Sequence, residues 1–92
     1  MARLIISREH DLEFNELCER AEQLADKLRE KFGGSWRWEE DTLHYNYSGG
    51  VDAQVNPYED EIEILVEMSM MMGMFKKQIE QEINRYLDDH LC

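Results

Sequence analysis

Hydrophobic and polar positions along the chain follow two periods, and the changes between them mark the expected elements. Residues 3–8 read as a short strand, and from Leu12 to Phe32 apolar residues recur every three or four positions. That spacing is typical of an amphipathic helix with one apolar face. Its stripe consists of Leu17, Ala21, Leu24, Leu28 and Phe32, with Cys18 and Ala25 widening it. The pattern predicts a strand followed by a long helix.

Different residues are expected to begin and end this helix. Before it, His10 or Asp11 is suited to cap the first turn, and Glu13 adds negative charge there. After it, Gly33 and Gly34 can adopt the left-handed backbone that commonly ends a helix.

The middle of the chain switches to a period of two residues on both sides of Glu40-Asp41. If these two residues form the loop of a hairpin, Trp38 lies opposite Leu43 and Trp36 lies opposite Tyr45. The large side chains then share one face of the sheet. They are Trp36, Trp38, Leu43, Tyr45 and Tyr47.

Two further strands and a second helix are expected after this hairpin. Val51, Ala53 and Val55 alternate with polar residues up to Pro57, which cannot donate to a ladder. A strand follows in which Ile62, Ile64, Val66, Met68 and Met70 form one face, and Glu61, Glu63 and Glu67 make the other largely acidic. Beyond Gly73 a helical period returns, with Phe75, Ile79, Ile83, Tyr86 or Leu87, and Leu91.

The predicted order is therefore β-α-β-β-β-β-α within a single domain, residues 1–92. Sequential strands joined by short turns form antiparallel neighbours, and an apolar sheet face must be covered. We expect an α+β fold, with an antiparallel sheet and two amphipathic helices packed on one face. The pattern leaves open where the first strand joins the sheet.

Composition narrows the classes of function. The 92 residues include 21 acidic and 10 basic ones, for a formal charge of −11, which disfavours nucleic acid as a partner. No apolar run is long enough for a membrane span, and the N-terminal apolar stretch is too short for a signal peptide. We expect a cytoplasmic protein, with Cys18 and Cys92 as free thiols.

Five of the six methionines lie within residues 68–74. Strand and helix periods predict that Met68, Met70 and Met74 face inward. A consecutive run at a glycine-broken junction cannot be buried in full, so at least one of Met71 and Met72 is expected to be exposed or in an interface. Methionine suits both cores and adaptable contact surfaces.

Four stretches of the chain, in this order, match a known family. They are Ile6 to Leu12, Leu28 to Gly33, Trp36 to Tyr45 and Lys77 to Ile83. In these stretches the chain resembles the polyhydroxyalkanoic acid system family, small proteins encoded with polyhydroxyalkanoate loci. The resemblance implies a non-enzymatic role in polyhydroxyalkanoate storage or its regulation, at storage granules, and it supplies no catalytic residues.

The chain departs from that family at its turns. Glu40 stands where the family usually has glycine, Gly49-Gly50 is doubled, and Ala53 replaces another common glycine. Since a positive φ disfavours glutamate, the turn at Glu40 is expected to be wider or of another type.

Two functional hypotheses follow. The first is a non-catalytic accessory or regulatory protein that contacts a granule, or a granule-associated protein, through Met71, Met72, Met74 and Phe75; a homodimer is compatible with it. The alternative is a small acyl or lipid-like ligand-binding module with a groove formed by Trp36, Trp38, Tyr45 and Tyr47, although these residues are more simply explained as core. His44 lacks a predicted catalytic partner, and the sequence predicts no catalytic residues, cofactor or metal site.

Overall fold

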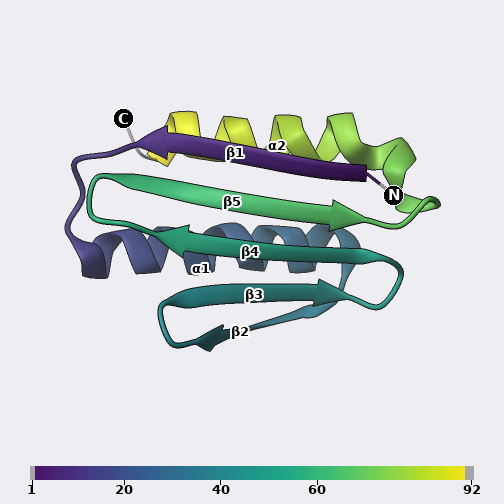
Figure 1. Ribbon diagram of the computed structural model, residues 1–92, viewed down its shortest axis with the longest axis horizontal. Coiled ribbons are helices and arrows are strands. Elements are labelled where there is room, and N and C mark those ends of the chain that lie inside the picture. Colours follow the sequence, from purple (N-terminus) through teal and green to yellow (C-terminus); the bar gives the residue numbers. More distant parts are fainter. Residues whose placement is uncertain (1, 91–92) are drawn as a thin grey trace.

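A computed structural model of the protein describes residues 2–90, and its elements follow the expected order. The strands are β1 (Ala2–Glu9), β2 (Ser35–Glu39), β3 (Thr42–Tyr47), β4 (Val51–Pro57) and β5 (Glu61–Met68); the helices are α1 (Phe14–Phe32), the short 3₁₀ helix η1 (Met72–Phe75) and α2 (Lys76–His90). The strands form one antiparallel sheet in the order β1-β5-β4-β3-β2 (Figure 1). This confirms the α+β fold and places β1 at the edge, beside β5.

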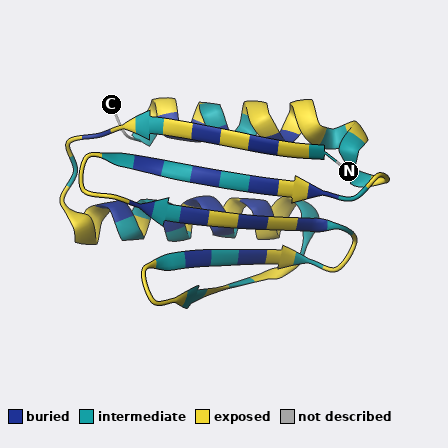
Figure 2. Ribbon diagram, in the orientation of Figure 1, coloured by how far each residue is buried: buried dark blue, intermediate teal, exposed yellow. Residues whose placement is uncertain are grey.

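Both helices cover the same face of the sheet, as predicted. Helix α1 contacts β2, β3 and β4, whereas α2 contacts β1 and runs along that margin of the sheet (Figure 1). Along each central strand, buried residues alternate with more exposed ones (Figure 2). The buried positions include the predicted helix residues Leu17, Leu24, Ile79, Ile83, Tyr86 and Leu87. Leu91, predicted to extend the second stripe, lies outside the described residues.

The central hairpin has the predicted register. Trp36 pairs with Tyr45 and Trp38 with Leu43, across a loop that consists only of Glu40 and Asp41. The expectation that the turn is wider or of another type, so that Glu40 avoids a positive φ, is wrong. Among residues 2–90, Glu40 is the one residue other than glycine with a positive φ, 55°. A positive φ at only the first loop position is the pattern of a type II′ turn, one of the two turns whose twist suits a hairpin.

The prediction that His10 or Asp11 caps α1 is wrong, because the helix begins at Phe14, after Glu13. His10, which directly follows β1, is instead buried beside the β4–β5 turn, where its backbone N–H donates to the carbonyl of Asp60 at 3.1 Å. Its Nδ1 accepts the N–H of Leu12 at 3.1 Å, so its Nε2–H donates to the carbonyl of Tyr58 at 2.8 Å. His10 thus fastens the β1–α1 connection to the sheet.

Candidate functional site

The methionines after β5 lie at the edge where the described ladders of β5 with β1 and β4 end. Met68 is 1% exposed and pairs with Ala2 of β1 and Val51 of β4, the terminal residues of those strands. Among the described residues neither ladder of β5 continues beyond Met68, and Met70 is 85% exposed. The prediction that Met70 continues the inward face of the strand is therefore wrong, while that for Met68 is confirmed.

The next residues form the 3₁₀ helix η1 and not the first turn of an α-helix. In a 3₁₀ helix, residues three positions apart share a side. Accordingly, Met72 and Phe75 pack against the core, and the Phe75 ring meets Phe32 edge to face at 6.4 Å. Met71 and Met74 point away from it and are 80% and 81% exposed. The inward placement predicted for Met74 is wrong, whereas the exposure predicted for one of Met71 and Met72 is confirmed.

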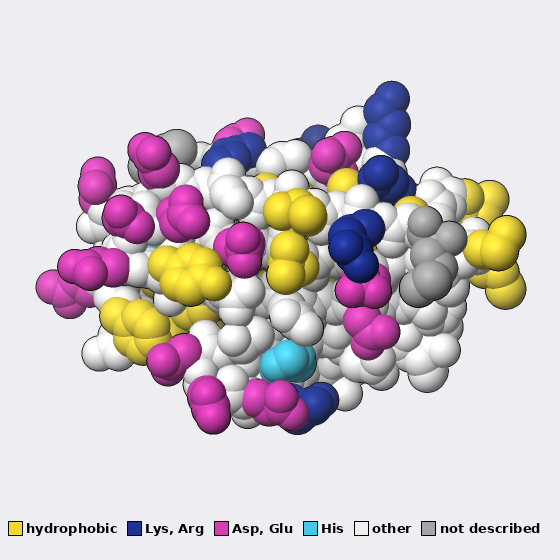
Figure 3. Space-filling model, viewed as in Figure 1, with side chains coloured by type: hydrophobic (Ala, Val, Ile, Leu, Met, Phe, Trp, Pro, Cys, Tyr) yellow, Lys and Arg dark blue, Asp and Glu magenta, His cyan; other side chains and the backbone are white. Residues whose placement is uncertain are grey.

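We call the exposed side chains of Met70, Met71 and Met74 the methionine tip. Figure 3 shows hydrophobic side chains gathered at the end of the molecule where β5 leads into α2. Met70 was missing from the predicted contact residues, which were Met71, Met72, Met74 and Phe75. The sequence signal that could have found it is Gly49-Gly50, because β4 begins after this turn, at Val51, and its ladder with β5 therefore ends at Met68.

The segment that carries the tip is held to the sheet by Ser69. The Ser69 N–H donates to the carbonyl of Gly50 at 2.8 Å, and the Ser69 hydroxyl accepts the N–H of Met72 at 3.3 Å. A further bond runs from the Gly73 N–H to the Ser69 carbonyl at 2.9 Å. These bonds give the exposed side chains a defined backbone, which reduces the conformational entropy that a contact would cost.

Negative charge is absent from the sequence around the tip. No acidic residue occurs between Glu67 and Glu80, although the chain carries a net charge of −11. Within this interval Lys76 and Lys77 are exposed at the start of α2. The segment that presents the methionines is therefore apolar and mildly basic.

The aromatic residues predicted to line a groove fill the space between the sheet and α1. Tyr45 is buried, and its hydroxyl donates to the carbonyls of Leu28, at 3.3 Å, and Gly33. Trp36 and Trp38 donate their indole N–H groups to α1 carboxylates, Asp26 at 2.8 Å and Glu22 at 2.6 Å, and with Tyr47 they pack partly buried against the core. This arrangement favours the core interpretation of the four residues.

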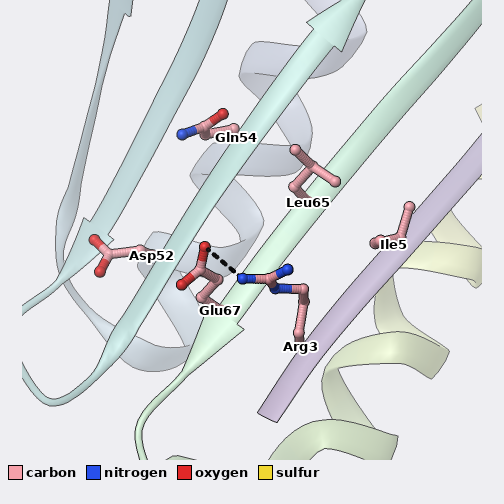
Figure 4. A pocket seen from close by; sticks show the side chains of 6 residues that line it. All are labelled: Arg3, Ile5, Asp52, Gln54, Leu65 and Glu67. Atoms are coloured by element: carbon pink, nitrogen blue, oxygen red, sulfur yellow. Dashed lines mark ion pairs between the residues drawn. The ribbon is translucent and has the colours of Figure 1, made fainter. Parts of the chain in front are cut away.

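The sheet face opposite the helices is polar, with a small apolar spot. A hollow on it is lined by Arg3, Ile5, Asp52, Gln54, Leu65 and Glu67 (Figure 4). In it the Arg3 guanidinium pairs with the Glu67 carboxylate across the β1–β5 ladder at 3.7 Å. Both side chains are more than half exposed, so the pair contributes little to stability. The predicted acidic face is thus partly neutralised by arginine.

Two side chains elsewhere, Cys18 and Glu39, have pKa values shifted by burial and by neighbouring charged groups. Burial raises the pKa of the Cys18 thiol, and the carboxylates of Glu22 and Asp41 add to this shift, so the thiol is poorly nucleophilic at neutral pH. The hydrogen bond from Arg37 lowers the pKa of the Glu39 carboxyl. The second oxygen of this carboxylate, Oε2, lies 3.3 Å from Nε2 of His44. Among residues 2–90, no three His, Cys, Asp or Glu side chains are grouped so that they could hold a metal ion.

A family model matches nearly the whole chain. The family described as "Putative polyhydroxyalkanoic acid system protein" matches residues 4–91. No curated protein sequence matches the chain. No helix within residues 2–90 is long and apolar enough to cross a membrane.

Proposed function

This chain belongs to the polyhydroxyalkanoic acid system protein family, and we propose that it is a non-catalytic accessory protein of polyhydroxyalkanoate storage. In this proposal it works in the cytoplasm, where it attaches to the apolar surface of the storage granule through the methionine tip. Attachment would regulate or protect the granule surface without a chemical step by this chain.

The observation that carries the proposal is the exposure of three neighbouring methionines. Met70, Met71 and Met74 are each at least 80% exposed, although a small domain gains stability by burying such side chains. Exposed apolar clusters of this kind commonly mark contact surfaces. Burial of a methionine side chain is worth about 2 kcal/mol, so three together supply useful affinity even after the loss of mobility.

The chemistry of the tip suits a polyester. Polyhydroxyalkanoates present alkyl groups and uncharged ester carbonyls, and their surfaces are irregular. Methionine side chains are flexible and polarizable, so they adapt to apolar partners without a fixed shape. The absence of carboxylates between Glu67 and Glu80 means that contact does not require the desolvation of charged acidic groups.

The proposal is tested by sedimentation with protein-free amorphous polyhydroxybutyrate granules. The test variant replaces Met70, Met71 and Met74 together with glutamine, which has a similar length but is polar. A matched control replaces Ile5 and Phe14 with glutamine, since these are also exposed apolar residues, at 64% and 49%, but lie away from the tip. We expect the tip variant to bind at least tenfold more weakly and the control to bind like the unaltered protein.

Two outcomes would contradict attachment through the tip to the polymer. One is an equal loss of binding in the tip variant and the control. The other is an unaltered protein that stays in the supernatant with protein-free granules. If it then sediments with native granules that retain their proteins, the contact is with a granule-associated protein and not with the polymer.

A further inference from the structure

Strand β2 forms one edge of the sheet, and the registers of the sheet show which of its backbone N–H and C=O groups are unpaired. The Tyr58 N–H donates to the Glu61 carbonyl at 2.8 Å, which sets the alternation of hydrogen-bonded pairs across β5, β4, β3 and β2. Followed through these registers, the backbone groups of Ser35, Arg37 and Glu39 face β3. Those of Trp36 and Trp38 therefore point outward from the sheet. Within the described residues, β3 is the one strand that pairs with β2.

The opposite margin is protected in a way that β2 is not. Helix α2 runs along β1 on the covered face (Figure 1). Neighbouring strands lie about 4.8 Å apart, whereas a helix is about 10 Å wide. If the β1 strands of two copies paired, their α2 helices would overlap. Helix α1 also contacts β3 and β4, so it lies further from its sheet margin and leaves room beside β2.

The side chains of β2 are also incompletely covered. Trp36 and Trp38 are only half-buried, although each indole N–H is bonded to a carboxylate of α1. On the other face, Arg37 and Glu39 are exposed and form an ion pair within the strand, with 2.9 Å between the guanidinium and the carboxylate, so that a second strand can exchange this pair for two pairs across the ladder. One short strand thus combines outward backbone groups, uncovered aromatic surface and a complementary pair of charges.

We propose that β2 pairs antiparallel with β2 of a second copy of this chain, about a twofold axis at Trp38. In this register Trp38 lies opposite Trp38 of the partner subunit on the covered face, where the two rings can pack together. Arg37 lies opposite Glu39 of the partner subunit on the other face, and symmetry repeats this ion pair. The two sheets then join into one continuous sheet.

Charge selects this register over its neighbours. An axis at Arg37 would place two arginines directly opposite each other, which destabilises a strand pair. An axis at Trp36 would place Arg37 opposite Ser35 and leave Glu39 beyond the paired strand. An axis at Glu39 would place two glutamates directly opposite each other. Among these axes, the one at Trp38 places each Arg37 opposite Glu39 of the partner subunit without a pair of like charges.

The charge of the whole chain predicts how the dimer responds to salt. Each copy carries −11, so two copies repel each other at low ionic strength. The screening length is about 8 Å at 0.15 M salt and about 30 Å at 0.01 M. The dimer is therefore expected to be at least tenfold tighter at 0.15 M than at 0.01 M salt.

Sedimentation equilibrium of the full chain, without polymer, tests the proposal. The variants are Arg37→Glu, Glu39→Arg and the double exchange, all at exposed positions, with folding checked by circular dichroism. Each single change is expected to weaken the dimer at least tenfold through like charges across the axis. The double exchange restores opposite charges and is expected to return the dissociation constant to within threefold of the unaltered value.

Arg3→Glu is the matched control, because it changes the net charge as Arg37→Glu does but lies on β1. It is expected to leave the dimer within threefold of the unaltered protein. A monomer at 0.5 mM protein and 0.15 M salt would overturn the proposal. So would a dimer that survives both single changes, or one that the double exchange does not restore. Because no granule is present, these results are independent of the proposed attachment to polymer.

Discussion

Ser69 lies directly against Gly50, and this contact fixes the segment that carries the methionine tip. The Ser69 N–H donates to the Gly50 carbonyl at 2.8 Å. Gly50 has a φ of +118°, and a Cβ on it would clash with the hydroxyl oxygen of Ser69. Position 50, in the turn between β3 and β4, therefore requires glycine, because a side chain there would occupy the space of Ser69 at the end of β5.

Gly50→Ala is expected to lower the free energy of unfolding by about 2 kcal/mol or more, because it adds both a steric conflict and an unfavourable φ. Urea denaturation followed by tryptophan fluorescence measures this change. Gly73→Ala is the control, since a Cβ there meets the Ala2 side chain at an ordinary 3.6 Å. A control as destabilised as Gly50→Ala would show that the Ser69 contact is not the cause.

Replacing methionines one at a time with glutamine should separate Met68 from the tip. Met68→Gln places a polar amide in a position that is 1% exposed, and we expect a loss of about 2–4 kcal/mol. Met70→Gln, Met71→Gln and Met74→Gln are each expected to change stability by less than about 0.5 kcal/mol. Chemical denaturation of the four variants provides the measurement. A large loss at Met71 or Met74 would contradict their exposed placement.

The hairpin shows how much of this fold could be predicted from the sequence. A period of two residues on either side of Glu40-Asp41 leaves few registers that keep the large side chains on one face, and Trp36 indeed pairs with Tyr45. The same reasoning predicted the buried stripes of both helices. Local periodicity is reliable where each residue of an element has a partner in the next element.

The tip and His10 show where that reasoning stops. Alternation in the sequence continues to Met70, but the partners of Met68 are the terminal residues of β1 and β4. His10 resembles a helix cap in the sequence, yet its ring bonds to Tyr58, which is 48 positions away. Both errors arise from tertiary contacts that are not encoded in the local pattern. The exposure of the tip therefore had to be read from the assembled sheet.

Glu40→Gly is expected to stabilise the protein by about 1 kcal/mol, because glycine adopts the φ of 55° without the strain that glutamate incurs. Asp41→Gly is the control: its φ is not positive, so glycine there only adds freedom to the unfolded chain and should be neutral or destabilising. Thermal and urea denaturation compare the variants. A less stable Glu40→Gly protein would indicate that the Glu40 side chain makes a contribution larger than the backbone strain.

The buried hydroxyl of Tyr45 is expected to make the protein sensitive to alkaline pH. Burial raises the pKa of this phenol above its usual value near 10, and the neighbouring Tyr47 adds to the shift. Above about pH 10 the unfolded chain therefore loses this proton while the folded chain keeps it. The contribution of Tyr45 to the free energy of unfolding is therefore fully present below about pH 10. It is lost as the pH rises from there through the pKa of the folded state.

Tyr45→Phe should reveal that contribution. At pH 8 the variant is expected to be about 1 kcal/mol less stable, because it lacks the hydrogen bonds to the carbonyls of Leu28 and Gly33. Between pH 9 and 11 its stability should fall less steeply than that of the unaltered protein. Burial also raises the pKa of Tyr86, so a smaller fall should remain.

Urea denaturation at several pH values measures how steeply the free energy of unfolding falls with pH, and Tyr58→Phe, at an exposed position, is the control. Equal slopes for Tyr45→Phe and the unaltered protein would mean that ionisation of Tyr45 is not linked to unfolding.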